Sequence, residues 1–270
     1  MAFQALQVLP DVCHIQDCMG VCMTLVMGQR EALLLDTGYG MEDIRQTVES
    51  LTDLQCRVLL THGHHDHVLG SRYFDRCEML AQDLEEFRQR TGKAQRQRVV
   101  QQAQQKHVSV PADYLQWSYQ DPVPLQMTGK TGSFSSESVS LGGREILLLH
   151  VPGHTPGSLM AYLPDERLLL TGDNWNPCTW LWFPSSLGLS SLHRNLQELL
   201  LLLPFERVLC SHQPGIRSRL EIERFLDAIE ENAVSRAERV DMGSDIDTRK
   251  LNIDEETGSC IVFDWNKRLQ

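Results

Sequence analysis

The segment His62-Gly63-His64-His65-Asp66-His67 places imidazoles and a carboxylate in ligand spacing within six positions. Residues i and i+2 of an extended segment project to the same side, so His62 and His64 can share one metal ion. Asp66 and His67 lie further along the turn and would face a second ion, whereas His65 is expected to point outward. Imidazole suits zinc, iron, copper or nickel, and a carboxylate adds negative charge and a group that handles protons. The spacing therefore predicts a metal site.

Two ions need more ligands than this loop contains, and three further candidates each follow a short aliphatic run. They are His154 after Ile146–Val151, Asp173 after Leu168–Leu170 and His212 after Arg207–Cys210. Each candidate opens a turn, as residues do when a set of strands delivers them to one edge of a sheet.

These motifs resemble those of the metallo-β-lactamase fold superfamily over nearly the whole chain. The resemblance rests on Asp36 in Leu-Asp-Thr-Gly, the 62–67 loop, His154 in Pro-Gly-His-Thr-Pro-Gly, Asp173 in Thr-Gly-Asp, and His212. It implies an α/β fold, a four-layer α/β/β/α sandwich with the site at the edge between its two sheets. It also implies that His62, His64 and His154 hold one metal ion, that Asp66, His67 and His212 hold the other, and that Asp173 bridges both. Asp36 would orient the ligand loop, although a turn-forming role fits the sequence equally well.

The expected chemistry is hydrolysis with two divalent ions, zinc by preference and iron or manganese as alternatives. Water bound to such ions loses a proton near neutral pH, so a metal-bridging hydroxide can attack an ester, thioester, lactone or related carbonyl bond. Asp66 and Asp173 are the candidate catalytic carboxylates, with Asp66 placed to orient the nucleophile or to pass a proton to the leaving group. An aspartate at the bridging position resembles thioesterases of the glyoxalase II kind and lactonases more than antibiotic-cleaving enzymes.

Two other functions stay open on sequence alone. A mononuclear-iron persulfide dioxygenase shares the first-site residue types, and only the metal bound and the oxygen consumed would separate it from a hydrolase. A metal-stabilised binding protein without turnover is disfavoured, because all seven candidate ligands are present.

Four aromatic residues crowd the segment after Asp173, namely Trp175, Trp180, Trp182 and Phe183. They would either form an apolar wall against the substrate or pack the loop onto the core, and we expect at least one ring in each role.

Composition limits the partners. With 270 residues, 41% of them hydrophobic, the chain can bury one substantial core. The net charge of −11 argues against a nucleic-acid partner, so a small-molecule substrate is expected, while oligomerisation stays open. Met1–Pro10 does not resemble an export leader and no apolar run reaches the length of a membrane span, so we expect a cytoplasmic location. Its eight scattered cysteines are expected to be free thiols.

We expect one domain over residues 1–270, built of two α/β halves at about 1–135 and 136–270 and joined near Thr128–Gly142. Residues 82–122 read as a helical insertion whose polar part, 82–107, would be a solvated helix, a lid or a dimer surface. Hydrophobic periodicity predicts strands at 21–26 and 32–35, helices at 42–51, 189–203 and 216–237, and a closing hairpin at 250–265.

Overall fold

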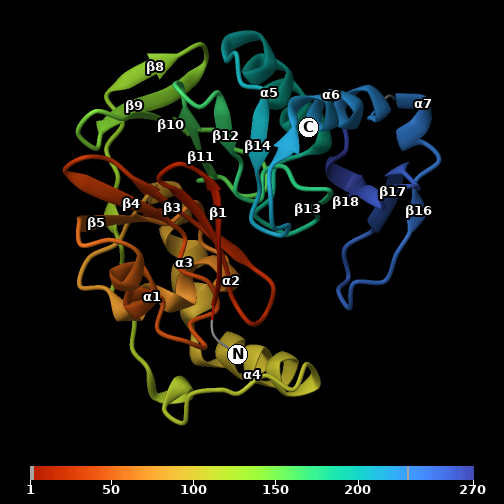
Figure 1. The fold of residues 1–270 in the computed structure, drawn as a ribbon. Helices are drawn as coiled ribbons and strands as arrows, with labels where there is room; N and C mark the ends of the chain where they lie inside the picture. Colours follow the sequence, from red (N-terminus) through yellow and green to blue (C-terminus); the bar gives the residue numbers. More distant parts are fainter. Residues whose placement is uncertain (1–2, 230) are drawn as a thin grey trace.

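The computed structural model describes residues 3–229 and 231–270. Two β-sheets face each other, and helices cover the outer face of each sheet, which gives the expected four layers (Figure 1). On the first sheet these helices are α1 (Ile44–Leu51), α2 (His65–Val68) and α3 (Leu84–Thr91). On the second sheet they are α5 (Leu189–Leu202) and α6 (Arg219–Ala228).

The first sheet contains seven strands in sequence order. They are β1 (Gln4–Leu9), β2 (Val12–Gln16), β3 (Cys22–Met27), β4 (Glu31–Leu35), β5 (Gln55–Leu59), β6 (Glu78–Met79) and β7 (Val123–Pro124). Strands β4 and β5 pair in parallel, with Leu35 opposite Leu59. Their carboxyl ends therefore meet at one edge, where Asp36 follows β4 and the histidine loop follows β5.

The second sheet also contains seven strands, in the order β15-β14-β12-β11-β10-β9-β8. Their bounds are β8 (Gly129–Thr131), β9 (Phe134–Ser140), β10 (Glu145–His150), β11 (Leu159–Leu163), β12 (Leu168–Leu170), β14 (Arg207–Leu209) and β15 (Arg217–Ser218). Strands β12 and β14 are parallel to each other, and β11 is antiparallel to both β10 and β12. The carboxyl ends of β10, β12 and β14 thus share an edge, to which they deliver His154, Asp173 and His212.

Alternating side chains on the strands bind the layers together. On β4, Leu33 and Leu35 lie in the cluster between the two sheets, whereas Ala32 and Leu34 face α1 and α3. This period of two is what a strand buried on both faces requires.

The junction between the halves is shorter than we expect from the sequence. The first sheet ends at Pro124 and the second begins at Gly129, so Thr128–Gly142 contains the hairpin of β8 and β9 instead of a linker. The helix expected at 216–237 is also divided into β15, α6 and α7 (Glu231–Val234). Its start is fixed by Ser218, which forms a capping box with Glu221.

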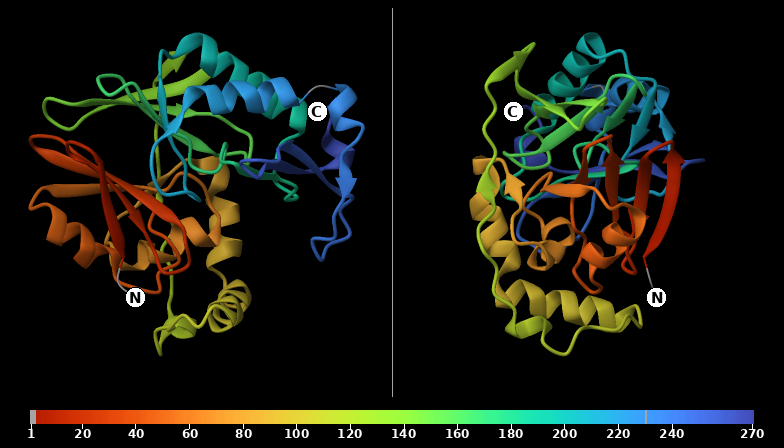
Figure 2. Two further views of the ribbon diagram at one scale, coloured as in Figure 1. Left: turned by 45° about the vertical axis from the view of Figure 1, so that its right-hand side comes forward. Right: turned by 60° about the vertical axis from the view of Figure 1, so that its left-hand side comes forward.

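A third, four-stranded sheet lies beside the sandwich near its C-terminal end (Figures 1 and 2). It contains β13 (Cys178–Leu181), β16 (Glu238–Arg239), β17 (Thr248–Asp254) and β18 (Ser259–Asp264). The hairpin expected at 250–265 is formed by β17 and β18. The parallel pairing of β13 with β18 was not expected, and it draws the aromatic segment after Asp173 against the C-terminal strands.

The segment between β6 and β7 is helical, as expected. It contains α3, α4 (Lys93–Gln105) and the short 3₁₀ helix η3 (Tyr114–Gln116), while α4 lies at the periphery of the molecule in Figure 2. The remaining 3₁₀ helices are η1 (Leu69–Tyr73), η2 (Ala81–Asp83) and η4 (Trp265–Lys267). Within the described residues, no helix combines the length and apolar character needed to cross a membrane.

Candidate metal centre

The histidine loop changes conformation within itself. His64 is extended, with φ −73° and ψ 147°, and α2 begins at the next residue. His62 and His64 therefore precede the helix, with His62 in a bend and His64 extended, whereas Asp66 and His67 belong to the first turn of α2. This change sends the two pairs of side chains toward two neighbouring positions, as the spacing predicts.

One position is surrounded by three buried histidines, His62, His64 and His154, whose candidate ligand atoms all lie within 4.8 Å of one another. His64 Nδ1 lies 2.8 Å from His154 Nε2. Because His154 comes from the turn after β10, this group joins the first sheet to the second.

The other position is surrounded by Asp66, His67, Asp173 and His212, again with ligand atoms within 4.8 Å of one another. Asp173 Oδ2 lies 2.9 Å from His212 Nε2 and 3.4 Å from His67 Nε2. The same oxygen lies 3.7 Å from His154 Nε2, so Asp173 reaches both groups. The side chain of His212 is 36% exposed, which makes this group the more open to solvent.

Several atoms at the centre of these groups have no hydrogen-bond partner among the described residues. His62 Nε2, His67 Nε2 and Asp173 Oδ1 are all buried in this state. Leaving a buried polar atom unpaired costs about 1–3 kcal/mol, so native proteins pair such atoms or use them as ligands. Imidazole nitrogens beside carboxylate oxygens are donors that suit zinc and related divalent ions. The donor set therefore fits bound metal ions.

Asp36 lies behind the ligand loop. Its Oδ1 accepts the Thr61 backbone N–H at 2.7 Å, and its Oδ2 accepts the Thr61 hydroxyl at 2.8 Å. His67 Nδ1 lies 2.8 Å from Oδ2, which leaves His67 Nε2 facing the other ligands. Asp36 adopts a φ of +67°, an uncommon conformation for a residue other than glycine. The structure thus places Asp36 where it fixes the orientation of His67.

Two acidic residues of the insertion also support this centre, although no motif in the sequence indicates them. Asp83 is fully buried and accepts hydrogen bonds from the Gly63 N–H at 2.8 Å, the Thr155 hydroxyl at 2.7 Å and the Gly157 N–H at 2.5 Å. It therefore ties the loop of His62 to the loop of His154. A Cβ on Gly63 would lie 2.7 Å from the Phe87 nitrogen, so only glycine permits this close approach of α3.

Glu86, in the first turn of α3, is the second of these residues. Its Oε1 lies 3.3 Å from His64 Nε2 and 2.7 Å from the Arg90 guanidinium. Around His154, the ring Nδ1–H donates to the backbone carbonyl of Trp180 at 2.6 Å and the backbone N–H donates to Asn174 Oδ1 at 2.8 Å. Such partners fix the ring orientation of ligating histidines.

Electrostatics separate the two groups. Burial lowers the pKa of His62 and of His154, and it lowers that of His64 to about 3, so these rings are neutral with free lone pairs near pH 7. For His67 and His212, burial acts in the same direction but is outweighed by Asp173 and Asp66, and the pKa rises. Burial raises the pKa of Asp66 and Asp173, yet the adjacent histidines lower it further, so both carboxylates are ionised.

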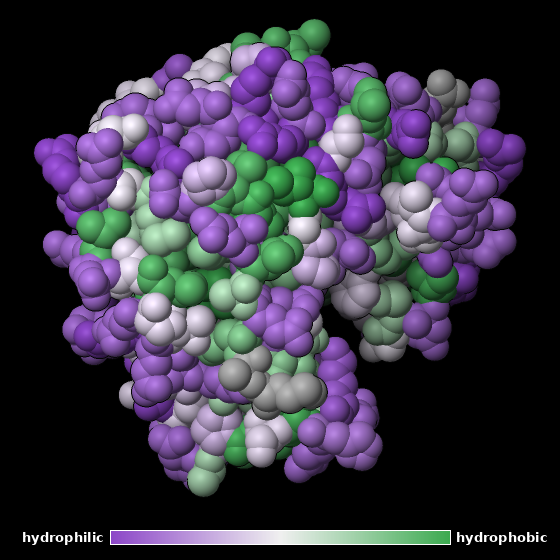
Figure 3. Space-filling view, in the orientation of Figure 1, coloured by the Kyte–Doolittle hydropathy of each residue, from purple (hydrophilic) through white to green (hydrophobic). Residues whose placement is uncertain are grey.

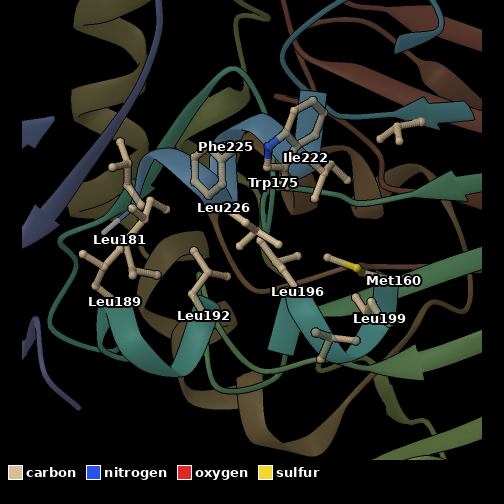
Figure 4. Packing of buried hydrophobic residues seen from close by; sticks show 14 of the residues in the cluster. Met160, Trp175, Leu181, Leu189, Leu192, Leu196, Leu199, Ile222, Phe225 and Leu226 are labelled. Carbon is tan, nitrogen blue, oxygen red and sulfur yellow. The ribbon is translucent and has the colours of Figure 1, made fainter. Parts of the chain in front are cut away.

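The four aromatic residues after Asp173 divide between two roles. Trp175 is 1% exposed and packs with Ile222 and Phe225 in the core of the second half, so the structure places it away from any substrate wall (Figure 4). The Phe183 ring centroid lies 4.5 Å from that of His64 and 4.7 Å from that of Trp182, which stacks on it. Trp180 is 40% exposed. Phe183 thus flanks the first ligand group, and Trp182 stacks on Phe183.

His65 does not point outward as expected. Its side chain is only 17% exposed, and its ring packs edge-on against Tyr39 with centroids 5.5 Å apart. The short helix α2 turns this residue inward.

On the face seen in Figure 3, the molecular surface is hollowed between α4 and the C-terminal sheet.

Comparison with known proteins places these motifs in a family. The family model described as the metallo-beta-lactamase superfamily matches residues 16–212, a range that includes every residue of both ligand groups.

Curated relatives match over part of the chain. The acyl-coenzyme A thioesterase MBLAC2 of Bos taurus is 25% identical over 167 residues, which cover 55% of this chain and 56% of that protein. A hydroxyacylglutathione hydrolase of Cereibacter sphaeroides is 30% identical over 118 residues, covering 44% of this chain and 33% of that protein. The chain thus spans about half the length of the first relative and a third of the second.

Solved structures share the fold at low identity. A metallo-beta-lactamase from Pontibacter korlensis superposes with a TM-score of 0.57 at 16% identity, covering 84% of this chain and 98% of that one. The sec-alkylsulfatase Pisa1 from Pseudomonas sp. gives a TM-score of 0.64 at 16% identity, covering 86% of this chain and 43% of that one. At such identities the likeness establishes the sandwich fold alone.

Proposed function

Because the chain belongs to the metallo-beta-lactamase superfamily, we propose that it is a dinuclear zinc hydrolase that cleaves the carbonyl bond of a thioester or of a related ester or lactone. The observation that carries the proposal is the position of Asp173, whose Oδ2 lies within 3.7 Å of His67, His154 and His212 and so touches both ligand groups. An acyl thioester is the first substrate class to test, since the bovine relative is named as an acyl-coenzyme A thioesterase.

In this proposal His62, His64 and His154 would hold one ion and Asp66, His67 and His212 would hold the other, with Asp173 in reach of both groups. When bound, the two ions supply a Lewis acid for the carbonyl and a water that deprotonates near neutral pH. Both catalytic carboxylates are ionised, so they accept hydrogen bonds from the attacking water and hold it in line. Asp66 would take one proton from the attacking water and pass it to the leaving thiolate, which departs as a thiol.

The apolar part of the substrate has a surface beside the first group. Phe183 lies against His64 and His154, with ring centroids 4.5 and 5.4 Å away, and Trp182 stacks behind it. An acyl chain laid on these rings would place its carbonyl at the ligand groups, where water can enter past His212.

Metal content and turnover test this function together. We expect untagged protein to contain about two zinc ions per chain by elemental mass spectrometry and to release free thiol from acyl-coenzyme A substrates. His64→Ala and Asp173→Ala, folded by circular dichroism, should lose zinc and activity, whereas His193→Ala, outside both groups, should retain them. About one iron per chain with oxygen uptake and no hydrolysis would instead establish the dioxygenase.

A further inference from the structure

Cys178 and Cys260 face each other on neighbouring strands. They are partners in the parallel register of β13 and β18, and their sulfur atoms lie 2.9 Å apart. All eight cysteines are free and lie in the described part of the chain, and only Cys178 is exposed, whereas Cys260 is buried. Reagents can therefore reach Cys178, whereas Cys260 is shielded from solvent next to it.

The pair needs little movement to close. A disulfide has a sulfur–sulfur distance of about 2.03–2.05 Å, so the two atoms would approach by less than about 1 Å. The pairing of β13 with β18 continues from Cys178 opposite Cys260 to Leu181 opposite Phe263. Leu181 and Phe263 are buried, so their packing stabilises this register. The fold thus keeps the two sulfurs together.

The surroundings activate the exposed thiol. Hydrogen bonding from the Cys260 thiol lowers the pKa of Cys178 to about 6, against the opposing effect of burial. Lys250 adds positive charge from β17, where it pairs with Val262, two residues from Cys260. In contrast, burial raises the pKa of Cys18 to about 11 and that of Cys22 to about 12. Since the thiolate is the nucleophile in thiol chemistry, Cys178 is the reactive cysteine of this chain.

We propose that Cys178 and Cys260 form a reversible redox site that reacts with a low-molecular-weight disulfide of the glutathione class. The Cys178 thiolate attacks one sulfur of glutathione disulfide, forms a mixed disulfide and releases one glutathione thiolate. Cys260 then loses its proton to solvent and attacks Cys178 Sγ, which releases the second glutathione. The two protein thiols are oxidised by two electrons, and one glutathione disulfide is reduced to two thiols.

The Cys178–Cys260 pair lies on a strand that also contacts the candidate metal centre. The redox proposal does not depend on the proposed hydrolase function. Trp180, on the same strand as Cys178, accepts the hydrogen bond from His154 Nδ1. None of the candidate metal ligands is a cysteine, so thiol reagents leave both ligand groups unmodified.

The full chain, as purified, is incubated with glutathione disulfide at a series of ratios to reduced glutathione, quenched with acid and N-ethylmaleimide, and mapped by peptide mass spectrometry. We expect a cross-linked peptide joining Cys178 to Cys260 that lacks two hydrogens and resists alkylation. Cys260→Ser should accumulate a glutathione adduct on Cys178, Cys178→Ser should form no disulfide at Cys260, and Cys18→Ser should behave as the native chain.

A second measurement needs no substitution. With limiting iodoacetamide at pH 7, Cys178 of the native chain should be alkylated at least about tenfold faster than Cys18. Absence of the Cys178–Cys260 cross-link at every glutathione ratio would overturn the proposal, as would alkylation of Cys178 no faster than that of Cys18.

Discussion

The Glu86 carboxylate lies 3.3 Å from Nε2 of His64, while Nδ1 of the same ring lies 2.8 Å from His154. A helix of the insertion thus holds the far side of a candidate metal ligand. Carboxylate–histidine pairs of this kind fix the ring and raise its basicity as a ligand.

Loss of this pair should weaken metal binding without unfolding the chain. We expect Glu86→Gln to lower zinc affinity about 10–100-fold, as removal of such partners does elsewhere. Competition with a chromophoric chelator measures the affinity. Glu85→Gln is the matched control, because Glu85 is exposed on the same helix and pairs with Gln89 and Arg88. Equal affinities of the two variants would show that Glu86 does not act on His64.

Replacement of Asp83 should lower the free energy of unfolding. Asp83→Ala removes the acceptor of three buried donors, on Gly63, Thr155 and Gly157, and each unpaired donor costs about 1–3 kcal/mol. We expect a loss of about 3–5 kcal/mol in the free energy of unfolding, measured by urea denaturation of the metal-free protein. Asp83→Asn keeps one acceptor oxygen and should lose less. Equal stability of Asp83→Ala and the native chain would contradict this role.

The free energy of unfolding should also decrease as the pH is lowered, because buried His14 resists protonation in the folded chain. This ring is buried, lies 3.0 Å from the Thr24 hydroxyl and 3.3 Å from the Gln213 carbonyl, and burial lowers its pKa to about 4. In the unfolded chain the histidine pKa is near 6.5, so between about pH 6.5 and 4 the unfolded chain binds more protons at this residue than the folded chain does. The contribution of neutral His14 is complete above this window and is lost as the pH falls through it, by at most about 3 kcal/mol.

The His14→Gln variant isolates this effect. All other groups titrate alike in both proteins, so the difference in unfolding free energy between the metal-free native chain and the variant should narrow as the pH falls from 7 to 4. A difference that stays constant over this range would rule out the titration of His14 as the cause.

Phe183 should affect acyl recognition, if the proposed function holds. Its ring flanks His64 and His154 and stacks on Trp182. Phe183→Ala is expected to raise KM about tenfold for a long-chain acyl thioester, because burial of about two methylenes is worth about 1.6 kcal/mol. The acetyl thioester of the same thiol serves as the control and should be little affected. A uniform loss of kcat on both substrates would argue instead for displacement of His64.

The sequence by itself determined the candidate ligands, and the resemblance of their motifs to a known family implied the four layers that carry them. The spacing of His62, His64, Asp66 and His67 places them on two faces because side-chain direction along a strand or a helical turn is a property of the local backbone. His154, Asp173 and His212 could be recognised because each follows an aliphatic strand, and parallel strands end at one edge. Leu33, Leu34 and Leu35 predict a strand but, being identical in type, do not say which layer each side chain enters; the structure assigns Leu33 and Leu35 to one cluster and Leu34 to another.

Only the tertiary structure decided which elements touch. Glu86 contacts His64, from which it is separated by 22 positions in the sequence, and Cys260 contacts Cys178, from which it is separated by 82 positions. Trp175 enters the core while Phe183 faces the first ligand group, although both follow Asp173 closely. These contacts depend on how whole elements pack, as when β13 pairs with β18, and the free energy of that packing is summed over many residues. No local spacing encodes it, so the supports of the site and the proximity of Cys178 to Cys260 became visible only in the folded chain.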